Sequence, residues 1–428
     1  MSVFAKASAS RSRTLKSVIG GIAVVGVSAL VLSGCASTPA EEEGSTTGPR
    51  EDLTLKIGTA LPVTGNLAFL GPPEIAGVGL AAKTINDADL GITVDVTYGD
   101  SGDADNKAYA TEVPRLLSAG VSAIIGAASS GTSKLFIDDV TGAGVIQFSP
   151  ANTSADFTTW DDDGLYWRTA PSDVLQGEVL GNLIAADGNS TLGIIYLNDS
   201  YGTGLTQFTT EAFEAAGGEV VASASYNTGD TSFDAQISEV TAANPDAIAL
   251  VAFEETKTIV PGLSDFPADK LYFVDGNLAD YSEDFEPGTL TGSKGTLPGL
   301  DTATLGTFTD DLQAYWTGTG EEELKDYSYA AESYDAVILL ALAALQANSV
   351  EGADIAAQLQ SVSGGVEGED GETTDDFAVA AQAILDGGKV NYDGKSGPIT
   401  FDENGDPTEA TIGIFQYNED NTYTRLPE

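Results

Sequence analysis

Short apolar runs alternate with longer amphipathic stretches along the chain from residue 53 onward. Four runs have the composition of β-strands: LTLKIGTALP (53–62), GITVDVTYG (91–99), VSAIIGA (121–127) and GVIQFSP (144–150). Between them, Ala76–Asn86 and Asp103–Leu117 repeat apolar residues with the period of a helix. This alternation predicts consecutive βα units with a parallel sheet.

A second series of the same kind begins after residue 170. It contains the predicted helices Val174–Ala186, Gly204–Ala216 and Phe233–Ala243 and the predicted strands 192–197, 218–226, 247–253 and 271–276. The strand AIALVAF (247–253) is apolar without alternation, as expected in a parallel sheet covered by helices on both faces. The pattern therefore predicts two α/β sandwiches in succession.

The later part of the chain returns to helices and then to strands. Ser333–Leu345 (SYDAVILLALAAL) is apolar on nearly every side but shorter than the ~20 residues that span a bilayer, so we expect a buried core helix. Strands are predicted on both sides of the acidic segment DENGD (402–406), which we interpret as a solvated turn.

The first 52 residues have a different pattern. Basic residues, the last of them Lys16, precede the apolar stretch Val18–Leu32, which leads into LSGC (32–35). This predicts a signal peptide over residues 1–34, and LSGC resembles the bacterial lipobox, in which the cysteine is lipidated. Residues 35–52 are rich in Ser, Thr, Pro, Gly and Glu, so we expect a flexible tether that starts at the lipidated Cys35.

Composition excludes several classes of function. The net charge of −47 disfavours binding to nucleic acid or anionic lipid and is consistent with a highly soluble surface. With no histidine and one cysteine, the chain cannot build a Ser-His-Asp or Cys-His nucleophile, an HExxH metal site, a thiolate zinc site or an internal disulfide. Nucleotide-binding and calcium-binding motifs are absent, so we expect no metal and no cofactor. Residue types alone leave open a paired-carboxylate hydrolase or a Ser-Lys enzyme.

Small hydroxyl residues follow two neighbouring predicted strands. In IIGAASSGTSK (124–134), Ser130 and Thr132 flank Gly131, and the next strand ends in SPANT (149–153). Ligands bind at the carboxyl ends of strands in open α/β sheets, and several neutral donors can hold a carboxylate without an arginine. The sequence thus predicts a carboxylate-binding site; the alternative is that these hydroxyl groups only cap the following helix.

These segments together resemble a known family. The chain is similar to the extracytoplasmic amino-acid-binding receptors of ABC transporters, the Leu/Ile/Val-binding type with the type I periplasmic-binding-protein fold. The resemblance rests on eight segments in family order: 57–81, 124–133, 144–154, 167–177, 197–205, 244–255, 271–276 and 394–406.

The resemblance implies an α/β protein of two Rossmann-like lobes with mostly parallel sheets joined by a hinge. The first lobe would comprise residues 53–171 and 297–408, and the second residues 172–296 and 409–428. Such a clamp closes on a solute without catalysis. One lobe supplies clustered hydrogen-bond donors and the other a carboxylate, so a zwitterion contacts both only in the closed state and therefore favours closure.

Several residues match ligand-binding positions of this family. Ser130 and Thr153 match the groups that hold the α-carboxylate, Ala151 contributes a backbone group, and Asp275 is the match for the acid that meets the ammonium. Further matches are Tyr201, which closes over the ligand, Leu70 beside the ligand side chain, and Phe253 with Glu254 as another wall. We interpret Asp173 as a helix N-cap rather than a ligand group.

The function implied is that of a lipid-anchored receptor of an ABC importer on the outer face of the cell membrane. Its partners would be the permease and ATPase subunits, and its solute an aliphatic or branched-chain amino acid. Alternatives are a receptor for an amide, urea or aromatic acid, a sensing module that feeds a signalling partner, and an extracellular carboxylate-dependent hydrolase.

Overall fold

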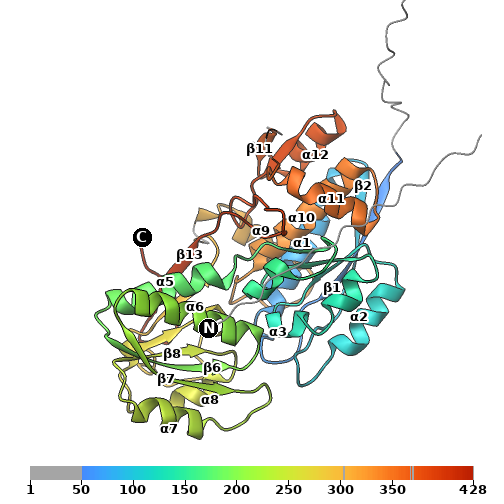
Figure 1. Cartoon of the computed structure of the whole chain (residues 1–428). Coiled ribbons are helices and arrows are strands. Elements are labelled where there is room, and N and C mark those ends of the chain that lie inside the picture. Colours follow the sequence, from blue (N-terminus) through green and yellow to red (C-terminus); the bar gives the residue numbers. More distant parts are fainter. Residues whose placement is uncertain (1–50, 302–303, 367, 369–370, 428) are drawn as a thin grey trace, which may run out of the picture. The chain divides into compact units, whose positions relative to one another are not determined.

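The computed structural model describes residues 51–301, 304–366, 368 and 371–427 (Figure 1). The predicted signal peptide, Cys35 and residues 35–50 of the predicted tether lie outside the described residues. Residues 49–428 form one compact unit. The architecture is α/β, as the sequence predicts, with two larger sheets that are mostly parallel.

The first sheet contains five parallel strands in the order β2-β1-β3-β4-β5. The strands are β1 Leu53–Ala60, β2 Ile92–Thr97, β3 Ala123–Gly126, β4 Ile146–Ser149 and β5 Tyr166–Arg168. Between them lie α1 Gly71–Ala88, α2 Tyr109–Ser118, α3 Ser130–Ser133, α4 Ile137–Thr141 and the 3-10 helix η1 Ala155–Thr159.

Both faces of this sheet are buried, which explains the unbroken apolar runs of its strands. Ala123 and Ile125 belong to a core cluster with α1, whereas Ile124 between them belongs to a cluster with α2 and α4. Successive side chains of a strand point to opposite faces, so an apolar residue is needed at every position.

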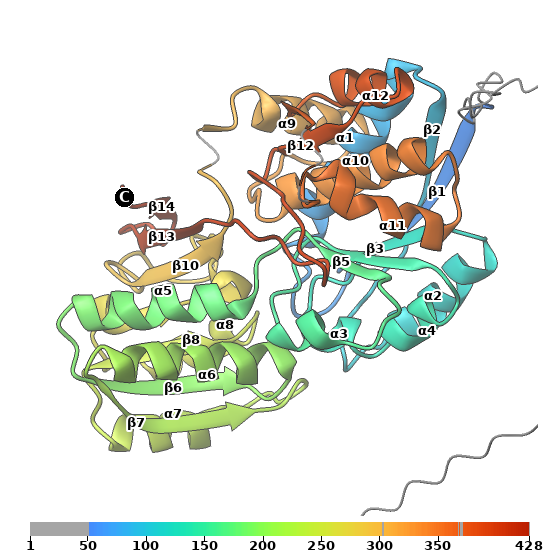
Figure 2. The ribbon, with the colours of Figure 1, turned by 45° about the horizontal axis from the view of Figure 1, so that its top comes forward.

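The second sheet has the strand order β14-β13-β10-β9-β8-β6-β7 (Figure 2). Its parallel strands are β6 Thr191–Leu197, β7 Glu219–Tyr226, β8 Ala247–Val251, β9 Leu271–Phe273 and β10 Lys294–Pro298. The strands β13 Ile412–Tyr417 and β14 Tyr423–Arg425 are antiparallel additions at one edge.

Helices cover this second sheet as well. They are α5 Asp173–Ala186, α6 Ser200–Ala215, α7 Asp234–Ala242 and α8 Thr256–Gly262, with the 3-10 helices η2 Ala268–Lys270 and η3 Asp275–Asn277. Figure 2 shows α5 and α6 side by side. A Cβ on Gly177 of α5 would lie 2.5 Å from Cβ of Phe208 in α6, so this close helix packing requires glycine.

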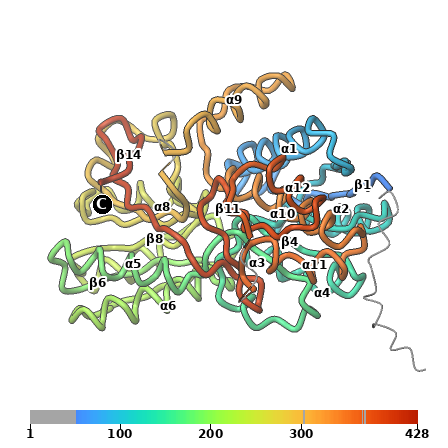
Figure 3. Tube along the Cα trace, turned by 90° about the horizontal axis from the view of Figure 1, so that it is seen from above, coloured from blue at the N-terminus to red at the C-terminus, as the bar shows by residue number. Residues whose placement is uncertain are grey.

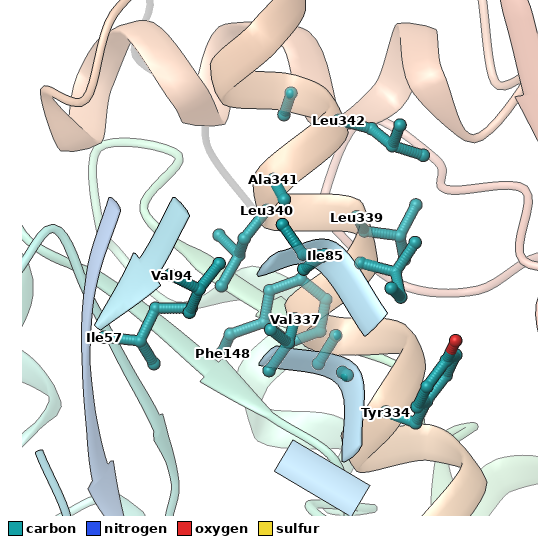
Figure 4. Close-up of a cluster of buried hydrophobic side chains, with 14 of the residues drawn as sticks. Ile57, Ile85, Val94, Phe148, Tyr334, Val337, Leu339, Leu340, Ala341 and Leu342 are labelled. Atoms are coloured by element: carbon teal, nitrogen blue, oxygen red, sulfur yellow. The ribbon is translucent and has the colours of Figure 1, made fainter. Parts of the chain in front are cut away.

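The remaining elements pack on the first sheet or on the helices that cover it. They are α9 Phe308–Gly318, α10 Ala330–Ala347, α11 Gly352–Val362 and α12 Phe377–Leu385, with β11 Glu372–Thr374 and β12 Val390–Tyr392 in a small separate sheet. Figure 4 shows Val337 and Leu340 of α10 among core residues of the first sheet. Within the described residues, α10 is the helix long and apolar enough to cross a membrane, but 89% of it is buried in the protein, which confirms the predicted core helix.

The chain passes between the two large sheets three times. It leaves the first sheet after β5, returns after β10, and crosses again before β13; Figure 3 shows this last segment in red on its way to β14. Arg168 at the end of β5 forms an ion pair with Asp406, with Nε 2.6 Å from Oδ1, next to the first and last crossings. Both side chains are largely removed from solvent, so this pair fixes the two segments to each other.

Some local predictions of structure are wrong. Helix α2 starts at Tyr109 and not at residue 103, because the Asp103 carboxylate accepts hydrogen bonds from the amides of Asp105 and Asn106 and forms a turn. Helix α6 starts earlier than predicted, at Ser200, because Asp199 caps it. The turn 402–406 is not simply solvated, since Asp406 is the partner of the buried Arg168.

Candidate functional site

A pocket lies where loops that follow strands of both sheets meet. Its lining residues are Leu67, Leu70, Ala128, Ser129, Ser130, Ala151, Tyr201, Phe253, Asp275, Gly276 and Tyr329. The loops after β3 and β4 contribute one wall, and the loops after β6, β8 and β9 contribute the other. The free space is about 10 Å³, room for about one water molecule, so the two walls are packed closely together.

The wall from the first sheet is held by its small hydroxyl residues. Ser129 is the N-cap of α3 and accepts from the amide of Thr132 at 3.2 Å. Ser130 Oγ instead accepts from the amide of Ser154 in the next loop, also at 3.2 Å. Asn152 Nδ2 donates to the carbonyl of Ala128 at 2.7 Å. Ser129 therefore caps the short helix, as one sequence interpretation expected, and Ser130 joins the two loops. Carboxylate binding by Ser130 stays a prediction.

Asp275 forms the polar centre of the opposite wall. Its carboxylate is 4% exposed and accepts from the hydroxyls of Tyr201 at 2.6 Å and Tyr329 at 2.7 Å and from Gln176 Nε2 at 3.0 Å. Burial raises the pKa of Asp275, and these hydrogen bonds oppose that rise. The ion pairs within the described part of the chain do not include Asp275. A buried carboxylate that has only neutral donors is suited to attract a ligand cation.

Two stacked rings complete this wall. Tyr201, in the first turn of α6, stacks on Phe253 with ring centroids 5.2 Å apart and an interplanar angle of 22°. The amide of Gly276 donates to the Tyr201 hydroxyl at 3.2 Å, and this hydroxyl donates to Asp275. The Tyr201 ring is thus held in place by the stacking on Phe253 and by the hydrogen bonds of its hydroxyl. It provides an aromatic surface beside the carboxylate of Asp275.

Most of the residues proposed from the sequence meet in this pocket, namely Leu70, Ser130, Ala151, Tyr201, Phe253 and Asp275. Gly131 and Thr132 line a neighbouring cavity of about 230 Å³ that shares Leu67, Ser129 and Phe253 with the pocket. A Cβ on Gly131 would lie 2.4 Å from Asp199 Oδ2, so glycine allows the second sheet's loop to approach here.

Thr153 is buried but does not line the pocket. Its carbonyl accepts from the amide of Asp173 at 2.6 Å, and its hydroxyl completes no hydrogen bond with the described residues. Asp173 is not a helix cap, as the sequence suggested, because Ser172 is the N-cap of α5 and Asp173 is its first residue. Burial, and then the charge of Asp275, raise the pKa of the Asp173 carboxyl well above its usual value.

Sequence reasoning missed Tyr329 and Gln176, the two other donors to Asp275. Tyr329 lies just before α10 with a φ of 59°, outside the eight segments that resemble the family. Gln176 lies inside α5 and within the segment 167–177, but no ligand-binding role was expected of it. The choice of Glu254 as a pocket wall is wrong, because its exposed carboxylate pairs with Lys257 at 3.1 Å. Its neighbour Glu255 is half-buried, and Asn66 Nδ2 donates to it at 2.5 Å.

Comparison with known proteins agrees with this geometry. The sequence profile of the family described as periplasmic binding protein matches residues 54–420. A leucine-, isoleucine-, valine-, threonine-, and alanine-binding protein from Pseudomonas aeruginosa is 30% identical over 191 residues, 44% of this chain and 50% of that protein. BasB, a chemotactic signal transduction system substrate-binding protein from Halobacterium salinarum, is 26% identical over 287 residues, 65% of each chain. The matches thus span between 50% and 65% of these curated relatives.

Solved structures show the same fold. LivJ from Streptococcus pneumoniae, a branched-chain amino acid transporter substrate-binding protein in complex with isoleucine, matches with a TM-score of 0.68 and 22% identity over 87% of this chain and 100% of that chain. The family consists of extracytoplasmic solute-binding receptors, so the prediction of a protein that is not an enzyme is confirmed. The chain belongs to the periplasmic binding protein family, with the two-lobed type I fold of the Leu/Ile/Val-binding proteins.

Proposed function

We propose that this chain is the receptor of an ABC importer and binds a small aliphatic or branched-chain amino acid between its lobes. The observation that carries the proposal is Asp275, a buried carboxylate held by three neutral donors and no cation of the described chain, across a pocket from Ser130 and Ala151. An amino acid carries both charges that such walls would bind.

Each part of the ligand has a counterpart in the proposed site. Asp275 receives the ammonium, and the Ser130 hydroxyl, the Ala151 backbone and, after opening, the Thr153 hydroxyl receive the carboxylate. Leu67, Leu70 and Phe253 offer the apolar surface for an aliphatic side chain. Tyr201 covers the ligand from the second lobe. Gly131 and Thr132 belong to the adjoining part of the cleft.

The proposed mechanism is closure about the three crossings, with lobes of residues 53–171 plus 297–408 and 172–296 plus 409–428. Entry requires the lobes to separate, because about 10 Å³ cannot hold an amino acid. Contacts that would break on opening include Asn66 Nδ2 to Glu255 and Ser154 Oγ to the Ser200 carbonyl at 3.3 Å. A ligand that touches both walls would favour the closed arrangement.

Delivery to a permease and its ATPase, and anchoring through the lipidated Cys35 on the outer face of the membrane, complete the proposed role. The relatedness to BasB supports one alternative, in which the same clamp reports its ligand to a signalling partner. The other alternative is a receptor for an amide, urea or an aromatic acid. Such a solute has no ammonium group for Asp275 to bind.

Calorimetric titration tests the proposal. The purified chain is freed of bound solute by unfolding and refolding and is titrated with leucine, isoleucine and valine, then with amides, urea and aromatic acids. Micromolar or tighter binding of an aliphatic amino acid is the expected result. Binding of an amide or aromatic acid alone would overturn the assignment of Asp275 to an ammonium and keep the receptor role.

A further inference from the structure

A second cavity, here called the hinge cavity, lies beside the segment that returns from β10. It encloses about 350 Å³, which is in the range of small-molecule sites. Its lining includes Leu297 of β10 and Leu300 just after it, Tyr329 and Glu332 at the start of α10, and Phe415 and Tyr423 of β13 and β14. Elements of both lobes therefore form its walls.

Glu332 distinguishes this cavity from an ordinary surface groove. The residue is 5% exposed, and among the described residues the donor to its carboxylate is its own backbone amide, with no donor from another residue. Its Oε1 is directed toward the lining residue Gly299, 3.0 Å from where a Cβ would stand. Near it, the carboxylate oxygens of Glu74 are buried and have no hydrogen-bond partner among the described residues. A buried carboxylate with a single donor is costly unless a ligand supplies more.

The basic residues that line the cavity are engaged elsewhere. Arg425 Nη1 donates to the carbonyl of Gly299 at 3.1 Å, and its guanidinium lies 5.8 Å from the ring centroid of Phe415. Lys325 pairs with Glu283 at 2.9 Å, and Lys395 pairs with Asp375 at 2.6 Å. The described ion pairs thus leave the carboxylate of Glu332 without a cation.

We propose that the hinge cavity binds a small primary alkylammonium, with Glu332 accepting hydrogen bonds from its N–H groups. The ammonium supplies the donors that Glu332 lacks, and Leu297, Leu300 and Tyr423 provide apolar and aromatic surface for the alkyl part. This site lies outside the pocket proposed for the amino acid, and the inference goes beyond that function.

Tyr329 connects the two sites. Its side chain lines both the hinge cavity and the interlobe pocket, and its hydroxyl donates to Asp275. An occupant that touches Tyr329 in the hinge cavity changes the position of a donor to the carboxylate proposed to bind the amino acid. Binding at the two sites should therefore be coupled, and the coupling must be reciprocal.

The test is calorimetric titration of the whole chain at pH 7 with n-butylammonium chloride and with n-butanol as the uncharged probe. We expect butylammonium to bind, n-butanol not to bind, and Glu332→Gln to weaken binding at least ~10-fold, whereas Glu321→Gln, an exposed acid, changes it by less than about twofold. Leu300→Trp, which fills the cavity without touching the carboxylate, should also abolish binding. Asp275→Asn, which leaves Glu332 in place, should weaken it far less than Glu332→Gln does.

A proton count adds an independent readout. Burial raises the pKa of Glu332 to about 8, so at pH 7 the carboxyl is mostly protonated, and an ammonium that selects its ionised form must release a proton. The measured enthalpy should then depend on the ionisation enthalpy of the buffer in the wild type and not in Glu332→Gln. The proposal would be overturned if butylammonium did not bind or if n-butanol bound equally well. It would also be overturned if Asp275→Asn lost binding while Glu332→Gln retained it. The last result would place the amine in the interlobe pocket.

Discussion

Asp406 and Asp275 are both buried carboxylates, but their partners differ in kind. Asp406 is held by the guanidinium of Arg168 through two hydrogen bonds, at 2.6 and 2.8 Å, and also accepts from the hydroxyl of Thr158. Asp275 is held by two tyrosine hydroxyls and one amide, all neutral. The first carboxylate has its countercharge within the chain, and the second has none among the described residues.

This difference separates structural from binding roles. A buried ion pair that is complete has nothing left to offer a ligand, and removal of one partner leaves an uncompensated charge. A carboxylate oriented by neutral donors retains its charge for a ligand, and the donors fix its position in advance. On this basis Asp406 is a structural residue near two of the crossings, and Asp275 is a candidate binding group.

The largest effect on stability is expected when the Arg168–Asp406 ion pair is broken. Arg168→Met leaves the Asp406 carboxylate without its countercharge and should lower the free energy of unfolding by about 3–5 kcal/mol. Urea denaturation followed by circular dichroism measures it. The double variant Arg168→Met/Asp406→Leu, which removes both charges, should recover much of this loss. Equal destabilisation of the single and double variants would show that packing, and not the unpaired charge, is responsible.

Asp275→Asn should weaken ligand binding strongly and change the stability of the fold little. Loss of the charge that meets the ammonium should weaken binding of leucine by about 1.5–3 kcal/mol, or roughly 10- to 100-fold, as expected for a hydrogen bond to a charged group. Stability should change little, since the amide retains hydrogen-bonding capacity. Calorimetry and urea denaturation of the same sample test both parts. If the variant bound leucine like the wild type but unfolded far more easily, Asp275 would have a structural role like that of Asp406.

Ser130→Ala should act at the other end of the ligand. We expect a loss of about 1.5 kcal/mol in leucine binding, the lower end of the same range, because one of several neutral donors to the carboxylate is removed. The amide of Ser154 also loses its acceptor, so urea denaturation is needed as the control. An unchanged affinity for leucine in a folded variant would exclude Ser130 from the site.

Glu332 provides a third case, a buried carboxyl that has neither a countercharge nor a side-chain donor among the described residues. Burial raises its pKa from 4.5 to about 8 in the folded chain, so between these values the unfolded state loses a proton that the folded state keeps. The contribution of Glu332 to stability is therefore greatest below pH 4.5 and falls as pH rises toward 8. Glu332→Gln should remove this loss of stability with rising pH, because glutamine does not titrate.

Thermal unfolding in amine-free buffers measures the effect. Between pH 5 and pH 8.5, the melting temperature of Glu332→Gln should rise relative to that of the wild type, by about 2 °C for each kcal/mol regained. Glu321→Gln, at an exposed position, should show no such trend. A constant difference between Glu332→Gln and wild type over this range would mean that Glu332 titrates near its ordinary pKa.

The sequence by itself determined the secondary structure and the class of fold. The apolar runs at 121–127 and 144–150 and the helical pattern at 174–186 became β3, β4 and α5, because side-chain periodicity and backbone hydrogen bonding act over short stretches of chain. The hydroxyl residues after β3 and β4 marked one wall of the pocket for the same reason, since parallel strands bring their carboxyl ends to one edge.

Only the tertiary structure decided which distant residues share a site. Arg168 and Asp406 are 238 residues apart, and Gln176 and Tyr329 meet Asp275 across 99 and 54 residues. Glu332 lies on an apolar helix whose pattern predicts a core and contains no sign of a cavity. Such pairings depend on how whole layers pack and on which polar groups burial leaves unsatisfied, and these are properties of the folded chain that no local pattern of residues contains.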